Sequence, residues 1–148
     1  MALRNVAHEH QLPEGFVYFE DERIIKTMNY ATDNNFIGRC IAGYLEPVCI
    51  LTTEAAGALT RAQDELDSYE KNYRFLIFDA YRPQQAVNDF INWSADPDDT
   101  KMRALYYPTV DKANLFRAGY IAKKSGHSRG STLDLTIVTQ AQDSQDYK

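Results

Sequence analysis

The chain has 148 residues, of which 44% are hydrophobic and 25% charged, and its formal net charge is −5. This size and composition are typical of one globular domain with a substantial core. The acidic balance argues against a general nucleic-acid or anionic-membrane surface, and no apolar run is long enough to cross a bilayer.

The N-terminal residues 1–11 are polar and lack the apolar core of a signal peptide, so we expect a cytoplasmic protein. This segment contains His8 and His10, which would share one side of an extended chain. Terminal histidines are most often only solvated, but this pair stays an alternative source of a metal ligand. Cys40 and Cys49 are too few for a disulfide framework, and we expect both to be reduced.

The hydrophobic pattern predicts a mixture of short strands and amphipathic helices. In chain order we expect strands near 16–19 and 24–25, a loop at 30–38, a helix capped by Thr52 or Thr53 that runs to about Tyr69, a buried strand at 75–78, a helix with Pro83 in its first turn and a short helix near 112–118. The run at 75–78 is apolar throughout, which is typical of a central strand covered on both faces.

Charged residues follow this buried strand directly, at Asp79 and Arg82. Loops at the ends of rigid elements often carry function. The planar guanidinium of Arg82 suits a carboxylate or a developing oxyanion. An ion pair between Asp79 and Arg82 that only fixes the strand end is an equally good interpretation.

The segment 125–134 holds His127 and, seven positions later, Asp134. Gly130 between them allows a tight turn that could bring the imidazole back over the next strand. From Thr132 the residues alternate, which predicts Leu133, Leu135 and Ile137 on the core face and Thr132, Asp134, Thr136 and Val138 on the opposite face. An imidazole and a carboxylate placed together in this way are half of a plausible zinc site.

Four blocks of the chain, read together, resemble one known family. They are residues 30–38, 79–83, 106–108 and 119–134, the last ending in Ser-x-His-x-x-Gly-x-Thr-x-Asp. In content and order they are similar to the D-Ala-D-Ala dipeptidases of the vancomycin-resistance type. One small departure is Thr132, where the family motif usually has alanine. The fold we expect is α+β, with an antiparallel sheet, helices packed on one face and the zinc motif at a strand edge, in a single domain over residues 1–148.

The resemblance implies a role for five residues. His127 and Asp134 match two of the family's three protein ligands for Zn2+. Arg82 matches the arginine that stabilises the substrate carbonyl oxygen as it becomes an oxyanion. Tyr30 and Ser125 match positions at the pocket for the substrate, the dipeptide D-Ala-D-Ala. The implied activity is that of a zinc metallopeptidase in cell-wall precursor metabolism.

The sequence departs from the family after Asp134. The family continues to a catalytic glutamate and a third zinc-binding histidine in a Glu-x-x-Trp-His pattern, and this chain has neither after that position. We therefore expect a C-terminally truncated member of the family that exposes apolar surface its relatives cover.

This departure keeps several functions open. One is zinc-dependent hydrolysis of D-Ala-D-Ala, another is a catalytically inactive remnant that retains the fold, and a third is a related D,D-carboxypeptidase. The missing zinc ligand could also come from His8, His10 or a second subunit of a homo-oligomer.

Overall fold

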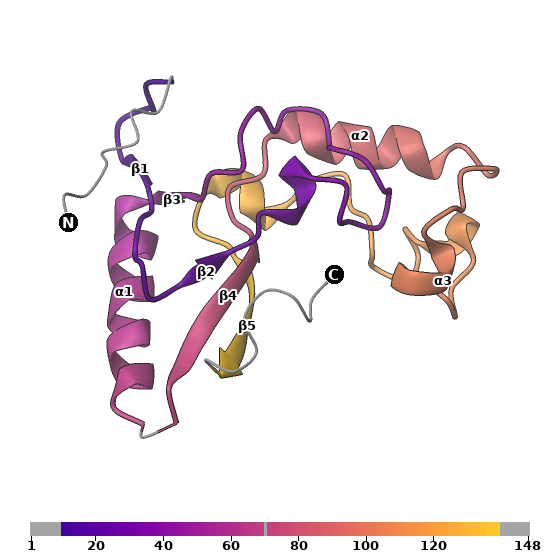
Figure 1. Ribbon diagram of the computed structural model, residues 1–148. Coiled ribbons are helices and arrows are strands. Elements are labelled where there is room, and N and C mark those ends of the chain that lie inside the picture. The colour runs from indigo at the N-terminus through magenta and orange to yellow at the C-terminus, as the bar shows by residue number, and fades with distance from the viewer. Residues whose placement is uncertain (1–9, 70, 140–148) are drawn as a thin grey trace.

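The computed structural model describes residues 10–69 and 71–139, which form an α+β fold as predicted (Figure 1). The strands are β1 (Phe16–Tyr18), β2 (Ile25–Lys26), β3 (Ile50–Thr52), β4 (Tyr73–Asp79) and β5 (Asp134–Thr139). The helices are α1 (Thr53–Asp67), α2 (Gln84–Ser94) and α3 (Arg103–Tyr106), with 3-10 turns η1 (Asn29–Ala31), η2 (Lys112–Asn114) and η3 (Gly126–Arg129).

Strand β4 is the centre of a three-stranded sheet of order β2-β4-β5, and β1 and β3 form a separate antiparallel pair. Strand β5 runs antiparallel to β4, as expected, whereas β2 runs parallel to it, so the larger sheet is mixed. The β4–β5 register places Asp79 opposite Asp134, with an irregularity between Ile77 and Asp79. The sheet therefore places the start of the 79–83 segment beside the end of the 125–134 segment.

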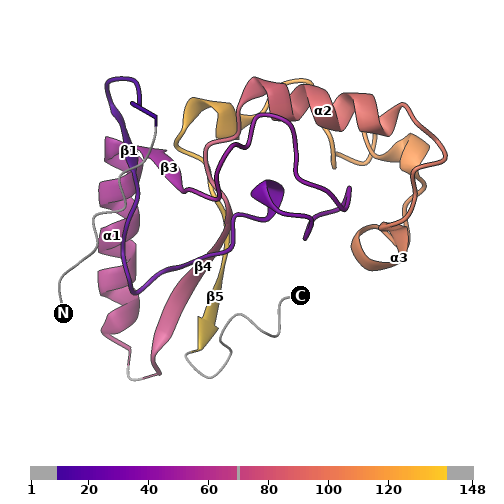
Figure 2. The ribbon, with the colours of Figure 1, turned by 45° about the horizontal axis from the view of Figure 1, so that its top comes forward.

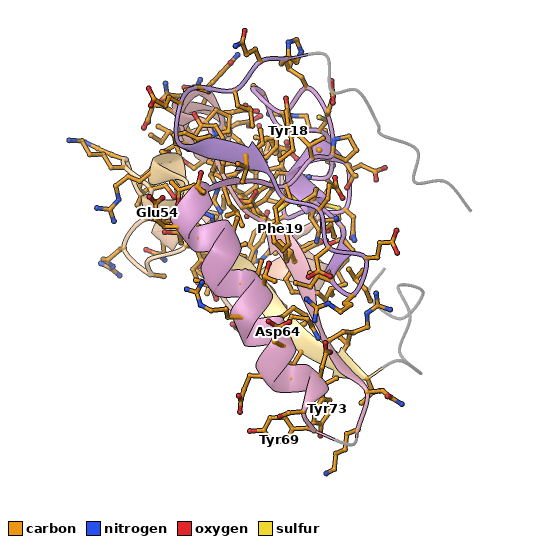
Figure 3. The ribbon with its side chains drawn as sticks, turned by 90° about the vertical axis from the view of Figure 1, so that its left-hand side faces the viewer. Tyr18, Phe19, Glu54, Asp64, Tyr69 and Tyr73 are labelled. Carbon is orange, nitrogen blue, oxygen red and sulfur yellow. The ribbon has the colours of Figure 1, made fainter. Side chains whose placement is uncertain are left out.

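Helix α1 begins where the sequence predicted, because the Thr52 hydroxyl accepts a hydrogen bond from the Ala55 amide at 3.3 Å. Its buried side includes Leu59, which shares a core with Ile77 of β4. Gln63 is fully buried, donates to the Tyr73 carbonyl at 3.2 Å and accepts from the Phe75 amide at 3.0 Å. These bonds tie α1 to β4, and Figure 3 looks onto this helix.

Strand β5 has the predicted alternation but not the predicted burial. Leu135 lies opposite Ile77 and Ile137 opposite Phe75, so both point to the face that α1 covers. However, α1 packs against β4 while β5 lies at the sheet edge, and Leu135 and Ile137 remain 38% and 49% exposed. Val138, predicted on the more polar face, is instead buried at 1% exposure.

A second core surrounds α2, which packs Phe90 and Trp93 against the loop segment that contains Ile37. Pro83 is the residue before α2, not a member of its first turn. The buried Lys112 ammonium lies 3.9 Å from the Trp93 ring centre and donates to the carbonyls of Asp96 and Asp99. The helix predicted near 112–118 is only a 3-10 turn, η2. Among residues 10–69 and 71–139, none of the helices has the length and apolar character of a membrane span.

The two cysteines should differ strongly in reactivity. Both are free, with Cys40 exposed and Cys49 buried beside Leu51. Burial raises the pKa of the Cys49 thiol to about 12, so at pH 8 it stays protonated and is a poor nucleophile. We expect one fast thiol and one slow thiol in a titration with an aromatic disulfide reagent at pH 8. Two equally fast thiols in the folded protein would contradict the placement of Cys49.

Candidate metal centre and substrate pocket

Three segments meet at one end of the three-stranded sheet (Figures 1 and 2). Asp79 ends β4, Asp134 starts β5, and η3 carries His127 beside them. The Arg82 amide donates to the His127 carbonyl at 3.3 Å, which joins the turn after β4 to η3. Gly130 ends η3 at φ +81°, and a Cβ there would lie 2.3 Å from the Phe16 ring, so only glycine fits this turn.

The imidazole of His127 is held in one orientation. Its Nδ1 lies 2.9 Å from the Ala80 carbonyl oxygen, so in the neutral ring Nδ1–H donates and Nε2 keeps a free lone pair. Nε2 lies 3.3 Å from the Asp134 Oδ1. A fixed imidazole nitrogen facing a carboxylate oxygen fits the nitrogen and oxygen ligands that zinc prefers. The two residues fit one metal position.

Asp79 lies on the other side of the His127 ring from Asp134. Its carboxylate is 1% exposed and accepts from the Tyr44 hydroxyl at 2.7 Å and from Arg82 Nε at 2.9 Å. Asp79, His127 and Asp134 offer atoms within 4.8 Å of one another. However, Asp79 faces Nδ1 at 3.5 Å, while Asp134 faces Nε2 on the other edge of the ring. We therefore assign Asp79 to orienting its neighbours and not to the metal position.

The sequence singled out Asp79 only as a partner of Arg82. The structure shows that this ion pair exists, with Arg82 Nη2 2.8 Å from Asp79 Oδ2. The same nitrogen lies 3.2 Å from Asp134 Oδ2, so the guanidinium also reaches the candidate metal ligand. The ion pair with Asp79 and a role at the site are therefore compatible interpretations of Arg82. Nε and Nη2 of its guanidinium contact Asp79, and Nη2 also reaches Asp134. The sequence feature that pointed to Asp79 was its position directly after the predicted buried strand at 75–78.

Aromatic rings fix the position of the guanidinium. The Arg82 Cζ lies 5.0 Å from the Tyr30 ring centre and 5.4 Å from that of Phe90. Burial raises the pKa of Asp79, although Arg82 and Tyr44 oppose this shift. The hydrogen bond from His127 lowers the pKa of Asp134. Burial lowers the pKa of His127, but the bonds to Asp134 and Ala80 outweigh it, and the net shift is upward.

Zinc affinity should therefore depend on pH through His127. A metal can bind Nε2 only after the proton leaves, and the raised pKa of His127 delays that loss to higher pH. We expect the affinity to fall by about tenfold per pH unit below that pKa and to level off above it. Competition with a chromogenic chelator between pH 5.5 and 8.5 measures this. A flat profile would contradict binding through an imidazole.

Tyr30 borders a pocket of about 110 Å3 next to the candidate metal position. The residues that line it are Asn29, Tyr30, Asn34, Asn35, Phe36, Phe78, Asp79, Tyr106 and Asp134. The Tyr30 ring packs against Phe36 and Phe90. Burial raises the pKa of Tyr30 to about 12, so the phenol stays protonated and can donate a hydrogen bond.

Ser125 lines a different hollow from Tyr30, with Gln84, Lys124, Gly126, Ser128 and Arg129. Its hydroxyl accepts from the His127 amide at 3.2 Å and caps η3. The structure therefore gives Ser125 a clear role in holding His127. It places Tyr30 beside Asp79 and Asp134, and Ser125 on the side of η3 that faces the start of α2.

Of the two N-terminal histidines the structure describes His10 alone, and His10 is not part of the candidate metal site. His10 is exposed and lines an apolar pocket with Tyr18, Leu45 and Tyr81. His8 lies outside the described ranges. Within those ranges, Asp79, His127 and Asp134 form the only group of three or more potential metal ligands.

An α+β fold that brings a histidine and an arginine to one carboxylate at the edge of a small pocket defines a candidate metal-dependent hydrolase. The sequence profile of the D-Ala-D-Ala dipeptidase family matches residues 18–145, and the chain belongs to this family. It is 43% identical over 108 residues to the D-alanyl-D-alanine dipeptidase of Streptomyces coelicolor, covering 73% of this chain and 52% of that protein.

Two further relatives carry the same name and have similar sequence identity to this chain. The D-alanyl-D-alanine dipeptidase of Enterococcus faecalis is 38% identical over 128 residues, which are 85% of this chain and 62% of the relative. That of Enterococcus faecium is 40% identical over 108 residues, or 73% and 52% of the two chains. The chain thus spans about half to three fifths of the length of these relatives, and the predicted family resemblance is confirmed.

Proposed function

We propose that the protein is a zinc-dependent hydrolase of D-Ala-D-Ala, acting in the cytoplasm on cell-wall precursors. The observation that carries this proposal is the convergence of His127 Nε2, Asp134 and Arg82 beside one pocket. Support comes from the family to which the chain belongs and from relatives that are named D-alanyl-D-alanine dipeptidases.

In this proposal His127 and Asp134 hold the metal. Zinc, when bound, polarises a peptide carbonyl and acidifies a water molecule. The Ala80 carbonyl keeps Nε2 of His127 free and aimed at the site. Because Asp79 and Tyr44 hold Arg82 in place before substrate binds, its guanidinium can meet negative charge as it develops on the carbonyl oxygen.

The pocket beside Tyr30 is the proposed site for the dipeptide. Its volume of about 110 Å3 suits small side chains better than large ones. The protonated Tyr30 hydroxyl can donate to a substrate carbonyl or carboxylate. Ser125 contributes through its bond to the His127 backbone and through the hollow beside η3.

Catalytic zinc usually has three protein ligands and an open position. The described residues supply two on the Nε2 side of His127. The two-ligand set also favours a second candidate, a protein that binds the metal or peptide without hydrolysing it.

A substrate comparison separates these functions. The whole protein is incubated with zinc and either D-Ala-D-Ala or N-acetyl-D-Ala-D-Ala, and released D-alanine is measured. We expect release from the free dipeptide and little from the acetylated one. Preference for the acetylated substrate would indicate a D,D-carboxypeptidase. No release from either, with zinc still bound, would indicate the non-catalytic alternative.

A further inference from the structure

Positive charge is concentrated in one part of this acidic chain. No Asp or Glu occurs between Asp111 and Asp134, although the formal net charge of the chain is −5. The cations in this stretch are Lys112, Arg117, Lys123, Lys124 and Arg129. Lys112 is buried and bonded to carbonyls, but Lys124 and Arg129 are exposed and line a common hollow.

This hollow has a volume of about 400 Å3 and lies between η3 and the start of α2. In both ribbon views η3 sits beside the first turn of α2 (Figures 1 and 2). The Gln84 amide donates to the Lys123 carbonyl at 3.3 Å and to Asn88 Oδ1 at 3.1 Å, which joins the two walls. The space is much larger than the roughly 30 Å3 of one water molecule.

The two cations at the hollow lack partners within the described residues. Neither Lys124 nor Arg129 makes an ion pair or a side-chain hydrogen bond there, whereas Arg23, Arg39, Arg82 and Arg103 each contact a carboxylate. Arg129 Nη2 lies 3.8 Å from the place that a Cβ on Gly126 would occupy, so the guanidinium folds back over η3. The Arg129 charge thus lies near the wall of the hollow, although the side chain as a whole is exposed.

One further hydrogen-bond donor borders the hollow. The Ser128 hydroxyl oxygen is buried and has no partner among the described residues, and Ser128 lines the hollow. A buried hydroxyl without a partner is unfavourable, and a shift of η3 that opened this hydroxyl to the hollow would let a ligand oxygen accept its hydrogen bond.

We propose that this hollow binds a small oxyanion, a carboxylate or a phosphate, through Arg129, Lys124 and Ser128. The planar fork of Arg129 suits two oxygens of one anion, and Lys124 adds a point charge. The oxyanion could be the terminal carboxylate of a peptide, since Ser125 lies on the same wall, or free inorganic phosphate. The inference requires neither bound metal nor turnover.

Isothermal titration of the protein with inorganic phosphate tests the site. Metal is removed with a chelator and the chelator is then dialysed away, so that phosphate cannot bind through zinc and no chelator carboxylate competes, and sodium chloride keeps the ionic strength constant. We expect saturable binding that Arg129→Ala weakens by about tenfold, the equivalent of one charge-assisted hydrogen bond. The matched control is Arg117→Ala, which removes the same charge outside the hollow and should leave the affinity unchanged.

A second matched pair is Lys124→Ala against Lys123→Ala, of which only Lys124 lines the hollow. Equal losses in each pair would mean general attraction to a basic surface and would overturn the proposal, as would the absence of saturable binding by either anion. Titration with N-acetyl-D-alanine, with its amide as the uncharged reference, distinguishes the two sources. Tighter binding of this carboxylate than of phosphate would identify the peptide terminus, and the reverse order would identify free phosphate.

Discussion

Replacing His127 with alanine should lower zinc affinity by more than about 100-fold, since loss of even an outer partner of a metal ligand typically costs 10–100-fold. The imidazole supplies the Nε2 lone pair, which the Ala80 carbonyl keeps free. Asp134→Asn should also weaken binding, because an amide oxygen carries no net charge to attract the cation. Both affinities are measured by competition with a chromogenic chelator at pH 8.

His10→Ala is the matched control for this experiment. His10 is exposed and lies outside the Asp79–His127–Asp134 group, so its removal should leave zinc affinity unchanged. Circular dichroism of each variant without metal shows whether the fold is retained. A His127→Ala protein that is folded and binds zinc as tightly as the parent would exclude His127 as a ligand.

Replacing Arg82 with alanine should lower kcat/KM for D-Ala-D-Ala by about 10²–10³-fold, the usual loss when one oxyanion donor is removed. The effect should fall mainly on kcat, because the guanidinium meets charge that develops only during the reaction. Zinc affinity should change much less than in the His127 variant. The measurement is D-alanine release by the whole protein at saturating zinc.

Arg82→Ala also leaves the buried Asp79 carboxylate without its cation, which would destabilise the fold. Arg82→Lys is therefore the more informative variant. It keeps the charge but loses the fork that reaches Asp79 and Asp134 together, so it should fold normally and remain slow. Arg39→Ala removes an arginine paired with Asp89 at the surface and serves as the control. Normal turnover by a folded Arg82→Lys enzyme would argue against the proposed role.

Local sequence signals predicted much of the fold. Thr52 as a helix cap, the apolar spacing of α1 and the continuous apolar run of β4 each reflect physics within one element. The parallel pairing of β2 and the exposure of Leu135 and Ile137 did not follow from the sequence. Both features depend on which strands become neighbours and on how far α1 reaches across the sheet. The alternation of apolar and polar residues along a single strand predicts neither of these.

At the site, too, the sequence predicted some features and not others. The sequence motifs selected His127, Asp134 and Arg82, and the structure brings these three together. The sequence did not reveal how Asp79 and Tyr44 hold Arg82, because Tyr44 lies 35 positions from Asp79 and its bond depends on the loop between. Ser125 caps η3 in the structure, a local role that its position two residues before His127 explains but did not predict.

The measurement that tests the central claim most directly is D-alanine release from D-Ala-D-Ala by the purified whole protein, with zinc supplied and with chelator as the control. The proposed site predicts release that stops with chelator, returns on addition of zinc and is absent from the His127→Ala variant. Release that continues in the presence of chelator, or in that variant, would contradict a zinc hydrolase built on His127 and Asp134.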